Sequence, residues 1–157
     1  GDTYSIDMIA DWKLCTSEQI SKEPMRRKIA GYETVCMNRI CPDYNLGVSV
    51  SVLEFKGCKS YKKIQKMDSL SFVDSKYYST ITWGKPGSVK VKQSVELVCM
   101  PVRHLETGKN IYMRMKKWYV QGKENVYLID FVSSSISGWN KWLPEMEKMI
   151  LSLKEID

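Results

Sequence analysis

The sequence predicts an α+β fold: an antiparallel β-sheet of five to seven strands covered by helices as an α/β/α sandwich, with an amphipathic helix at the C-terminus. Three observations predict it: alternating apolar and polar residues dominate the middle of the chain, a short connection joins two such segments as a hairpin, and apolar residues recur with helical spacing near the end. The 157 residues, 43% hydrophobic and 27% charged, have a globular composition. No linker or repeat divides them, so we expect a single domain over residues 1–157.

The clearest strand covers Leu46 to Phe55, where valines alternate with serines along most of the segment. Ser88 to Val102 is predicted to be one long strand, because apolar residues continue along one of its faces. Shorter or less regular strand candidates are Tyr4 to Met8, Trp12 to Cys15, Gly31 to Ile40 and Tyr77 to Thr82.

Two helices are expected. The first is capped by Ser60 and ends before Ser75, with apolar residues recurring at three-residue spacing and lysines between them. In the second, proline is tolerated only in the first turn, so the regular helix is expected to start close to Pro144 and to end near Lys154. Its apolar face is expected to pack on the sheet through Trp139, Met146, Ile150 and Leu153.

The best hairpin joins Asn110 to Val120 with Asn125 to Ser133 through a four-residue connection, which requires antiparallel pairing. In the first arm, alternation separates two sets of side chains onto opposite faces. One set is Ile111, Met113 and Met115, and the other is Tyr112, Arg114, Lys116 and Trp118.

Positive charge is concentrated around this hairpin. The chain has 24 Lys and Arg against 18 Asp and Glu, giving +6 at pH 7. Nine basic residues but only two acids lie between Lys85 and Lys123. Such a region attracts anionic partners, although a lysine-rich face can equally be a solvated surface that protects a sheet from aggregation.

The candidate partner-binding site is a row along the first arm of the hairpin. Its predicted members are Arg114, Lys116 and Trp118, with Lys90 or Lys92 added if the Ser88 to Val102 strand is the neighbour. Exposed ion pairs contribute only about 0–1 kcal/mol each, so we expect a transient, salt-sensitive contact with an acidic protein or an anionic membrane surface. Single-stranded nucleic acid stacking on Tyr112 and Trp118 is the weaker alternative. If Trp118 lies beneath a helix instead, the row is structural.

No catalytic chemistry is predicted. His104 is the only histidine, and it stands in a predicted loop with no Gly-x-Ser-x-Gly or His-Glu-x-x-His motif nearby. We therefore expect no catalytic residue, no metal site, no cofactor and no enzyme activity. The sequence contains no run of about 18 apolar residues, which is the length that a membrane-spanning helix requires.

The five cysteines are an odd number, so at least one thiol is free. Cys36 and Cys41 would lie about 16 Å apart on a continuous strand, which is too far for a disulfide unless the chain turns between them. The chain starts with Gly-Asp rather than methionine, which favours a trimmed product whose signal segment is absent.

The C-terminal third resembles the PsbP-like α/β/α sandwich superfamily. The likeness lies in Val126-Tyr127-Leu128-Ile129-Asp130-Phe131, the serine-rich loop after it, and the helix that closes in Met149-Ile150-Leu151-Ser152-Leu153. Near the N-terminus, Tyr4-Ser5-Ile6-Asp7-Met8 followed by Asp11-Trp12-Lys13 is also similar, although Ala10 stands where a proline is common.

The resemblance implies a non-catalytic binding or assembly module outside the cytoplasm, secreted, periplasmic or lipid-anchored, with no site residues to transfer. A helix-grip domain that encloses an apolar small molecule is the alternative architecture. In that case the nine methionines and the tryptophans would line a cavity, whereas otherwise Met113, Met115, Met146 and Met149 simply fill the core between sheet and helix. An enclosed volume of about 300 Å³ or more between sheet and helix would distinguish the two.

Overall fold

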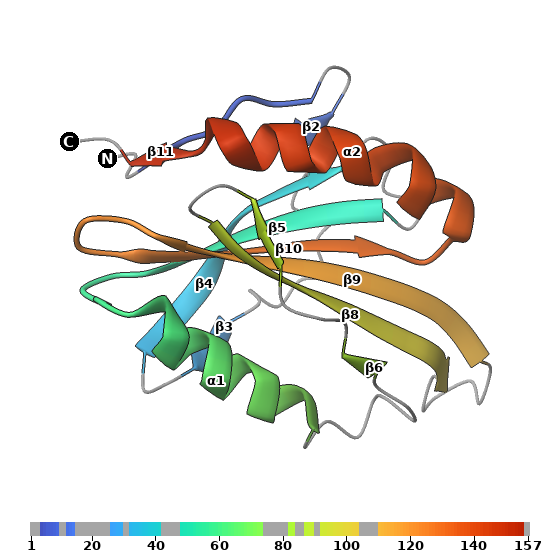
Figure 1. The fold of residues 1–157 in the computed structure, drawn as a ribbon, viewed down its shortest axis with the longest axis horizontal. Helices are drawn as coiled ribbons and strands as arrows, with labels where there is room; N and C mark the ends of the chain where they lie inside the picture. The colour runs from blue at the N-terminus through green and yellow to red at the C-terminus, as the bar shows by residue number, and fades with distance from the viewer. Residues whose placement is uncertain are drawn as a thin grey trace.

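A computed structural model describes residues 4–9, 12–14, 26–29, 32–41, 48–73, 82–83, 87–89, 92–103 and 110–155 (Figure 1). The two helices are α1 (Tyr61–Val73) and α2 (Ile136–Ser152). The strands are β1 (Tyr4–Ser5), β2 (Lys13–Leu14), β3 (Arg26–Ile29), β4 (Tyr32–Cys41), β5 (Val48–Phe55), β6 (Thr82–Trp83), β7 (Gly87–Val89), β8 (Lys92–Arg103), β9 (Asn110–Gln121), β10 (Val126–Ser133) and β11 (Lys154–Glu155).

The strands form one large antiparallel sheet. Its order is β2-β4-β5-β10-β9-β8-β6, with β3 paired to β4 and β7 paired to β8, giving nine strands among the described residues. The predicted α+β class is therefore confirmed, whereas the count exceeds the five to seven expected. The excess comes from pieces of two to four residues, β2, β3, β6 and β7, which are too short to show a clear period. A separate pair, β1 with β11, joins the two ends of the described chain.

The predicted long strand from Ser88 to Val102 is wrong as a single element. It is a tight hairpin in which β7 turns back onto β8, with Val89 opposite Lys92. In a hairpin this short, apolar and polar residues alternate in both strands without an evident break. The alternation therefore does not show that the chain reverses direction. The hairpin of β9 and β10 matches the prediction, and its register runs from Gln121 opposite Val126 to Arg114 opposite Ser133.

β4 contains both Cys36 and Cys41, so the chain makes no turn between these two cysteines, although a bulge lies between Cys36 and Asn38. The predicted strand from Tyr77 to Thr82 lies outside the described residues except for Thr82, which is the first residue of β6.

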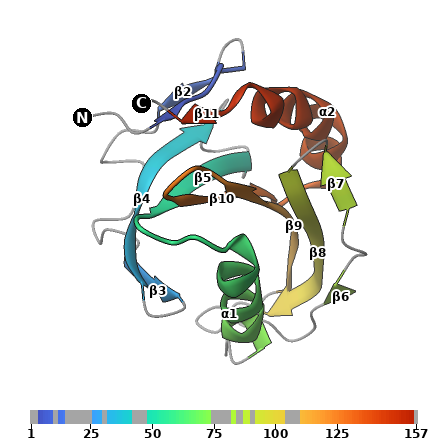
Figure 2. The same ribbon diagram turned by 60° about the vertical axis from the view of Figure 1, so that its left-hand side comes forward.

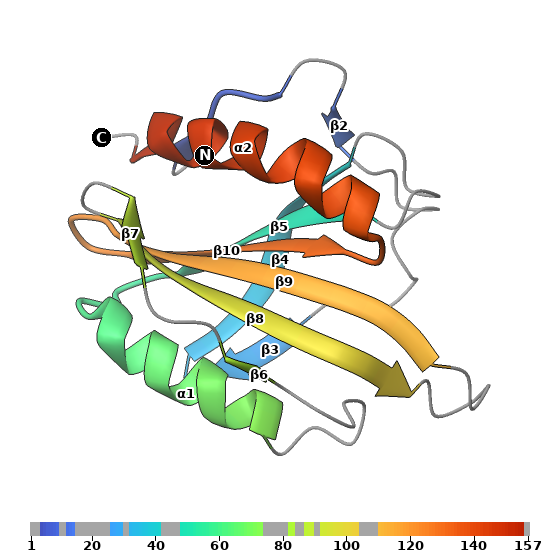
Figure 3. The same cartoon turned by 45° about the vertical axis from the view of Figure 1, so that its right-hand side comes forward.

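The helices lie on opposite faces of the sheet (Figures 1 and 3). β5 shows how the sequence supplies both layers, since Val48, Val50 and Val52 belong to the core on the α2 side, and Phe55 is buried on the alternate face. Burying each such side chain contributes about 1.5–3 kcal/mol. α1 begins directly after Ser60 and ends before Ser75, as predicted, and contacts β9 and β10.

Helix α2 starts two turns earlier than predicted, at Ile136 rather than near Pro144. Ser135 caps it, because its side chain accepts a hydrogen bond of 3.0 Å from the backbone amide of Gly138. Pro144 therefore lies inside the helix, and the N-terminal turns bend away from the rest (Figure 1). The additional turns bury Trp139, whose ring stacks on Phe131 with centroids 5.2 Å apart, and this burial offsets the cost of about 3 kcal/mol for an internal proline.

The face of α2 that packs on the sheet is the predicted one. Trp139, Met146, Ile150 and Leu153 are all buried in one core cluster with Trp118, Tyr127, Ile129 and Phe131 of the sheet.

At Gly138 the backbone of α2 lies close to Val48 of β5. A methyl group there would lie 2.7 Å from both Ser135 Oγ and Val48 Cγ2. We expect Gly138→Ala to destabilise the fold by about 1–2 kcal/mol in urea denaturation, because the overlap outweighs the gain of about 1 kcal/mol in helix propensity. Ser137→Ala, at an exposed neighbour, should change stability by less than about 0.5 kcal/mol. A Gly138→Ala protein as stable as the unmodified one would contradict this packing.

Candidate functional site

The predicted partner-binding row lies beneath α2 rather than on the surface. Trp118 is 0% exposed and belongs to the core under the helix, so the prediction that it is an accessible aromatic is wrong. The alternation along β9 is as predicted, but the face that carries the row is the face on which α2 packs. Arg114 is partly buried and lies 4.5 Å from the centre of the Trp139 ring. Trp139 belongs to the N-terminal turns of α2, which lie before the predicted start of the helix.

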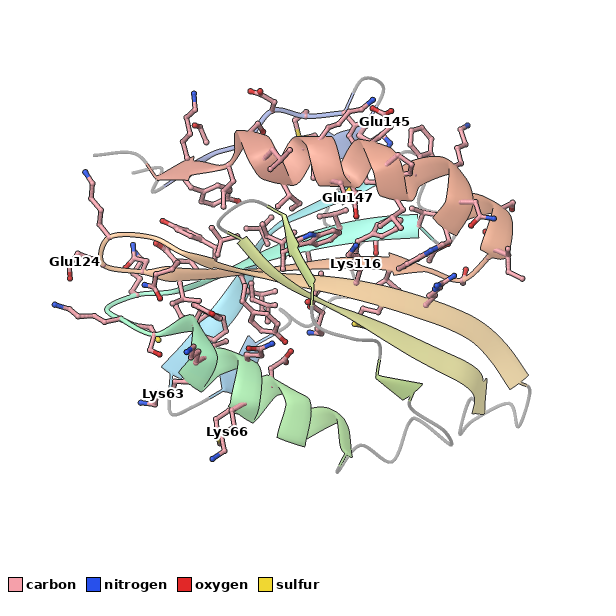
Figure 4. All side chains as sticks on the ribbon, in the orientation of Figure 1. Lys63, Lys66, Lys116, Glu124, Glu145 and Glu147 are labelled. Carbon is pink, nitrogen blue, oxygen red and sulfur yellow. The ribbon has the colours of Figure 1, made fainter. Side chains whose placement is uncertain are left out.

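Lys116 is held by α2 as well. Its Nζ lies 2.7 Å from Glu147 Oε1 and 5.5 Å from the centre of the Trp118 ring, and Figure 4 shows the two charged side chains facing each other between β9 and α2. β8 is the neighbour of β9, as expected. Lys92 is the first residue of β8, whereas Lys90 lies outside the described residues. The row is therefore part of the sheet–helix interface where it is described.

Lys117 points to the other face of the sheet, into a buried ionic network. Its Nζ lies 2.7 Å from Asp68 Oδ2 of α1 and 2.8 Å from Asp130 Oδ1 of β10. The hydroxyl of Tyr119 donates a hydrogen bond of 3.0 Å to the same oxygen of Asp68. The side chains of Lys117 and Asp68 are fully buried. We call Asp68, Lys117, Tyr119 and Asp130 the ionic cluster.

The geometry of the ionic cluster favours a structural role. A lysine between two carboxylates could in principle transfer protons, but a substrate would have to reach its Nζ, and that side chain has no exposed surface. The cluster instead fixes α1 on the sheet, because Asp68 is bound to Lys117 and Tyr119 of β9, and Lys117 in turn is bound to Asp130 of β10. Sequence reasoning missed it, although Asp130 interrupts an apolar strand and Asp68 follows buried Ile64 by one helical turn.

The start of α1 is fastened separately, to the turn between β9 and β10. The backbone amide of Tyr61 donates to Gln121 Oε1 at 2.9 Å, and that of Gly57 donates to Asn125 Oδ1 at 3.1 Å. Lys59 forms an exposed ion pair with Glu124 at 3.3 Å. α1 is thus held at its first turn by the hairpin and at its middle by the ionic cluster.

The outer side of α1 and the residues just before it carry a group of exposed lysines. Lys59, Lys62, Lys63 and Lys66 are all exposed, and we call them the lysine face. Their spacing of three and four residues places them opposite buried Ile64 and Asp68. No acidic residue occurs between Glu54 and Asp68. Figure 4 shows Lys63 and Lys66 pointing away from the sheet, and Figure 2 shows α1 at the outside of the fold.

The sequence prediction did not anticipate that the row is covered by α2, because counting charges along the chain does not reveal burial. Of the basic residues around the hairpin, Arg114, Lys116 and Lys117 are engaged with groups inside the fold. The sequence pattern predicts the lysines of α1 only as the polar side of an amphipathic helix. The absence of any acidic residue among these lysines is the sequence feature that could have indicated a basic surface here.

The layer between the sheet and α2 is filled where it is described. Trp118, Phe131, Met146 and Ile150 each have 0% exposure, whereas side chains that line a cavity of ligand size would retain accessible surface. Met115 is buried on the opposite face of β9, and Met113 lies where side chains are not described. This packing supports core methionines rather than an apolar ligand site at these positions.

Comparison with known proteins identifies the fold. No protein-family model and no curated protein matches the chain. Among solved structures, it is similar to cyanobacterial PsbP (CyanoP) from Synechocystis, with a TM-score of 0.54 and 9% identity over 98% of this chain and 87% of that one. It is also similar to LpqN, involved in cell envelope biogenesis of Mycobacterium tuberculosis, with a TM-score of 0.48 and 10% identity over 98% of this chain and 83% of that one. The chain has a PsbP-like fold, as the sequence resemblance implied.

Two further observations concern the described residues alone. No helix among them is both long and apolar enough to cross a membrane. Within the same residues, no three His, Cys, Asp or Glu side chains come together in a way that could hold a metal ion. Cys58 has a free, buried thiol that donates a hydrogen bond to the carbonyl oxygen of Ser60 at 3.6 Å.

Proposed function

We propose that the chain is a single-domain, non-catalytic binding module of PsbP-like fold that engages a negatively charged partner through the lysine face. The observation that carries this proposal is the clustering of four exposed lysines, three of them on one side of a firmly attached helix and the fourth just before it. Like charges one turn apart destabilise a helix by about 0.2–0.5 kcal/mol per pair, so the fold maintains this arrangement against its own repulsion.

The attachment of α1 favours binding. An interface element that is already ordered loses less conformational entropy on association. The ionic cluster and the contacts with the hairpin turn hold the helix in place before any partner arrives. On the outer side of α2, Lys148 is paired with Glu145 at 2.8 Å, and at the start of α1 Lys59 is paired with Glu124 at 3.3 Å.

A charge-matched pair of variants tests the proposal. We expect Lys62→Gln/Lys63→Gln/Lys66→Gln to weaken binding of fluorescent poly-L-glutamate, measured by anisotropy, by about tenfold or more, since each lysine contributes up to about 1 kcal/mol near an anionic surface. The control, Lys141→Gln/Lys148→Gln/Lys154→Gln, removes the same charge from two exposed sites on α2 and one on the strand that follows it. It should weaken binding by less than about threefold. Equal losses in both variants would show that net charge, not the lysine face, attracts the probe.

We propose in addition that the module works outside the cytoplasm, a location supported by the PsbP-like resemblance. Fractionation of the native cells tests it, and recovery in the cytosolic fraction would contradict it.

A further inference from the structure

We propose that the anionic partner is a lipid bilayer, and that the lysine face lies flat on its headgroups. This inference rests on the proposed function, because it names the kind of surface that the lysine face binds. Three features favour a bilayer over an acidic protein: the chemistry of the charges, an exposed methionine beside them, and the position of the helix in the fold.

The charges suit a headgroup plane. All four are lysine ammonium groups, which act as point charges without the planar, paired geometry that arginine uses to recognise individual carboxylates. A bilayer presents a diffuse field and needs no such geometry, and clusters of four to eight basic residues on an amphipathic helix are the pattern that anionic headgroups attract. A folded acidic partner is recognised through complementary charges that fix a register, a task for which the paired geometry of arginine is better suited.

Met67 supplies an apolar group at the edge of the lysine face. It is 41% exposed, and it follows Lys63 by one helical turn. A flexible thioether side chain among lysines can enter the boundary between headgroups and acyl chains, whereas it gains nothing from a purely acidic polymer. An exposed methionine beside the lysines therefore favours a bilayer over an acidic protein.

The helix is also placed where a plane can reach it. Figures 1 and 3 show α1 on the outside of the molecule, on the side of the sheet opposite α2. Docking through α1 would leave α2, with its mixed charges, facing away from the membrane.

Vesicle sedimentation tests the proposal on the full chain. We expect binding to phosphatidylcholine vesicles that contain one third phosphatidylglycerol, and none to pure phosphatidylcholine. Binding should weaken sharply between about 0.01 M and 0.15 M salt, as the Debye length falls from about 30 Å to about 8 Å. The triple glutamine variant of Lys62, Lys63 and Lys66 should bind about a hundredfold more weakly, and the charge-matched variant of Lys141, Lys148 and Lys154 only a fewfold more weakly. Circular dichroism of both variants verifies that they are folded.

Met67→Gln separates a lipid from an acidic polymer. We expect it to reduce vesicle binding severalfold while leaving poly-L-glutamate binding unchanged, because only the bilayer offers an apolar boundary. A chain that binds poly-L-glutamate through the lysine face but ignores phosphatidylglycerol vesicles overturns the lipid proposal and leaves the proposed function standing. A chain that binds neither overturns both. Equal loss of vesicle binding in the two charge variants, or an unchanged Met67→Gln, also overturns the lipid proposal.

Discussion

Replacing Lys117 by methionine is expected to destabilise the fold by about 3–5 kcal/mol. The methionine preserves most of the side-chain volume but removes the cation that Asp68 and Asp130 share at 2.7 Å and 2.8 Å. Two buried carboxylates then face each other across an apolar side chain, and breaking a buried ion pair by removing one member is more costly than never having formed it. Urea denaturation followed by circular dichroism measures the change.

The adjacent residue provides the control. Lys116 lies on the opposite face of the same strand, and its partner Glu147 is 39% exposed, so this carboxylate can be solvated when the lysine is lost. Lys116→Met should cost about 1 kcal/mol or less. Combining Lys117→Met with Asp68→Asn and Asp130→Asn should recover part of the stability, because no uncompensated carboxylate remains. Equal effects at positions 116 and 117 would contradict the burial of the ionic cluster.

The two faces of the sheet were predictable because strand alternation is a local property. The periods of β5, β9 and β10 follow directly from the sequence, and the buried face of α2 follows from helical spacing. The start of α2 was not predictable from Pro144 alone. The rule that proline begins a helix is a preference, and here the burial of Trp139 and the cap at Ser135 outweigh it.

The candidate site was less predictable than the fold, for a physical reason. Whether a lysine is exposed depends on which helix covers which face, and this is a tertiary property. Lys116 and Lys117 have identical chemistry and adjacent positions, yet one is paired with α2 and the other is buried beneath α1. The lysine face is different, since an acid-free basic segment on an amphipathic helix is visible without any tertiary contact.

Ending the chain after Ser137 is expected to abolish cooperative folding. The truncation removes Trp139, Met146, Met149, Ile150 and Leu153 and exposes the sheet residues that they cover. At about 1.5–3 kcal/mol for each buried side chain, the loss is about 8–15 kcal/mol, which matches or exceeds the whole stability of a typical domain of about 5–15 kcal/mol. Near-ultraviolet circular dichroism and a urea titration should therefore show no fixed tertiary packing and no sigmoidal transition.

Full-length variants separate the loss of packing from the loss of chain. Trp139→Ala combined with Met146→Ala should destabilise the fold by about 5 kcal/mol or more, because each leaves a cavity between α2 and the sheet. Ile136→Ala combined with Leu151→Ala changes two residues of the same helix that are 59% and 37% exposed, and it should cost less than about 1 kcal/mol. A truncated chain that still unfolds cooperatively, or equal effects of the two double variants, would mean that the sheet is stable without α2 and that the core lies on the α1 side instead.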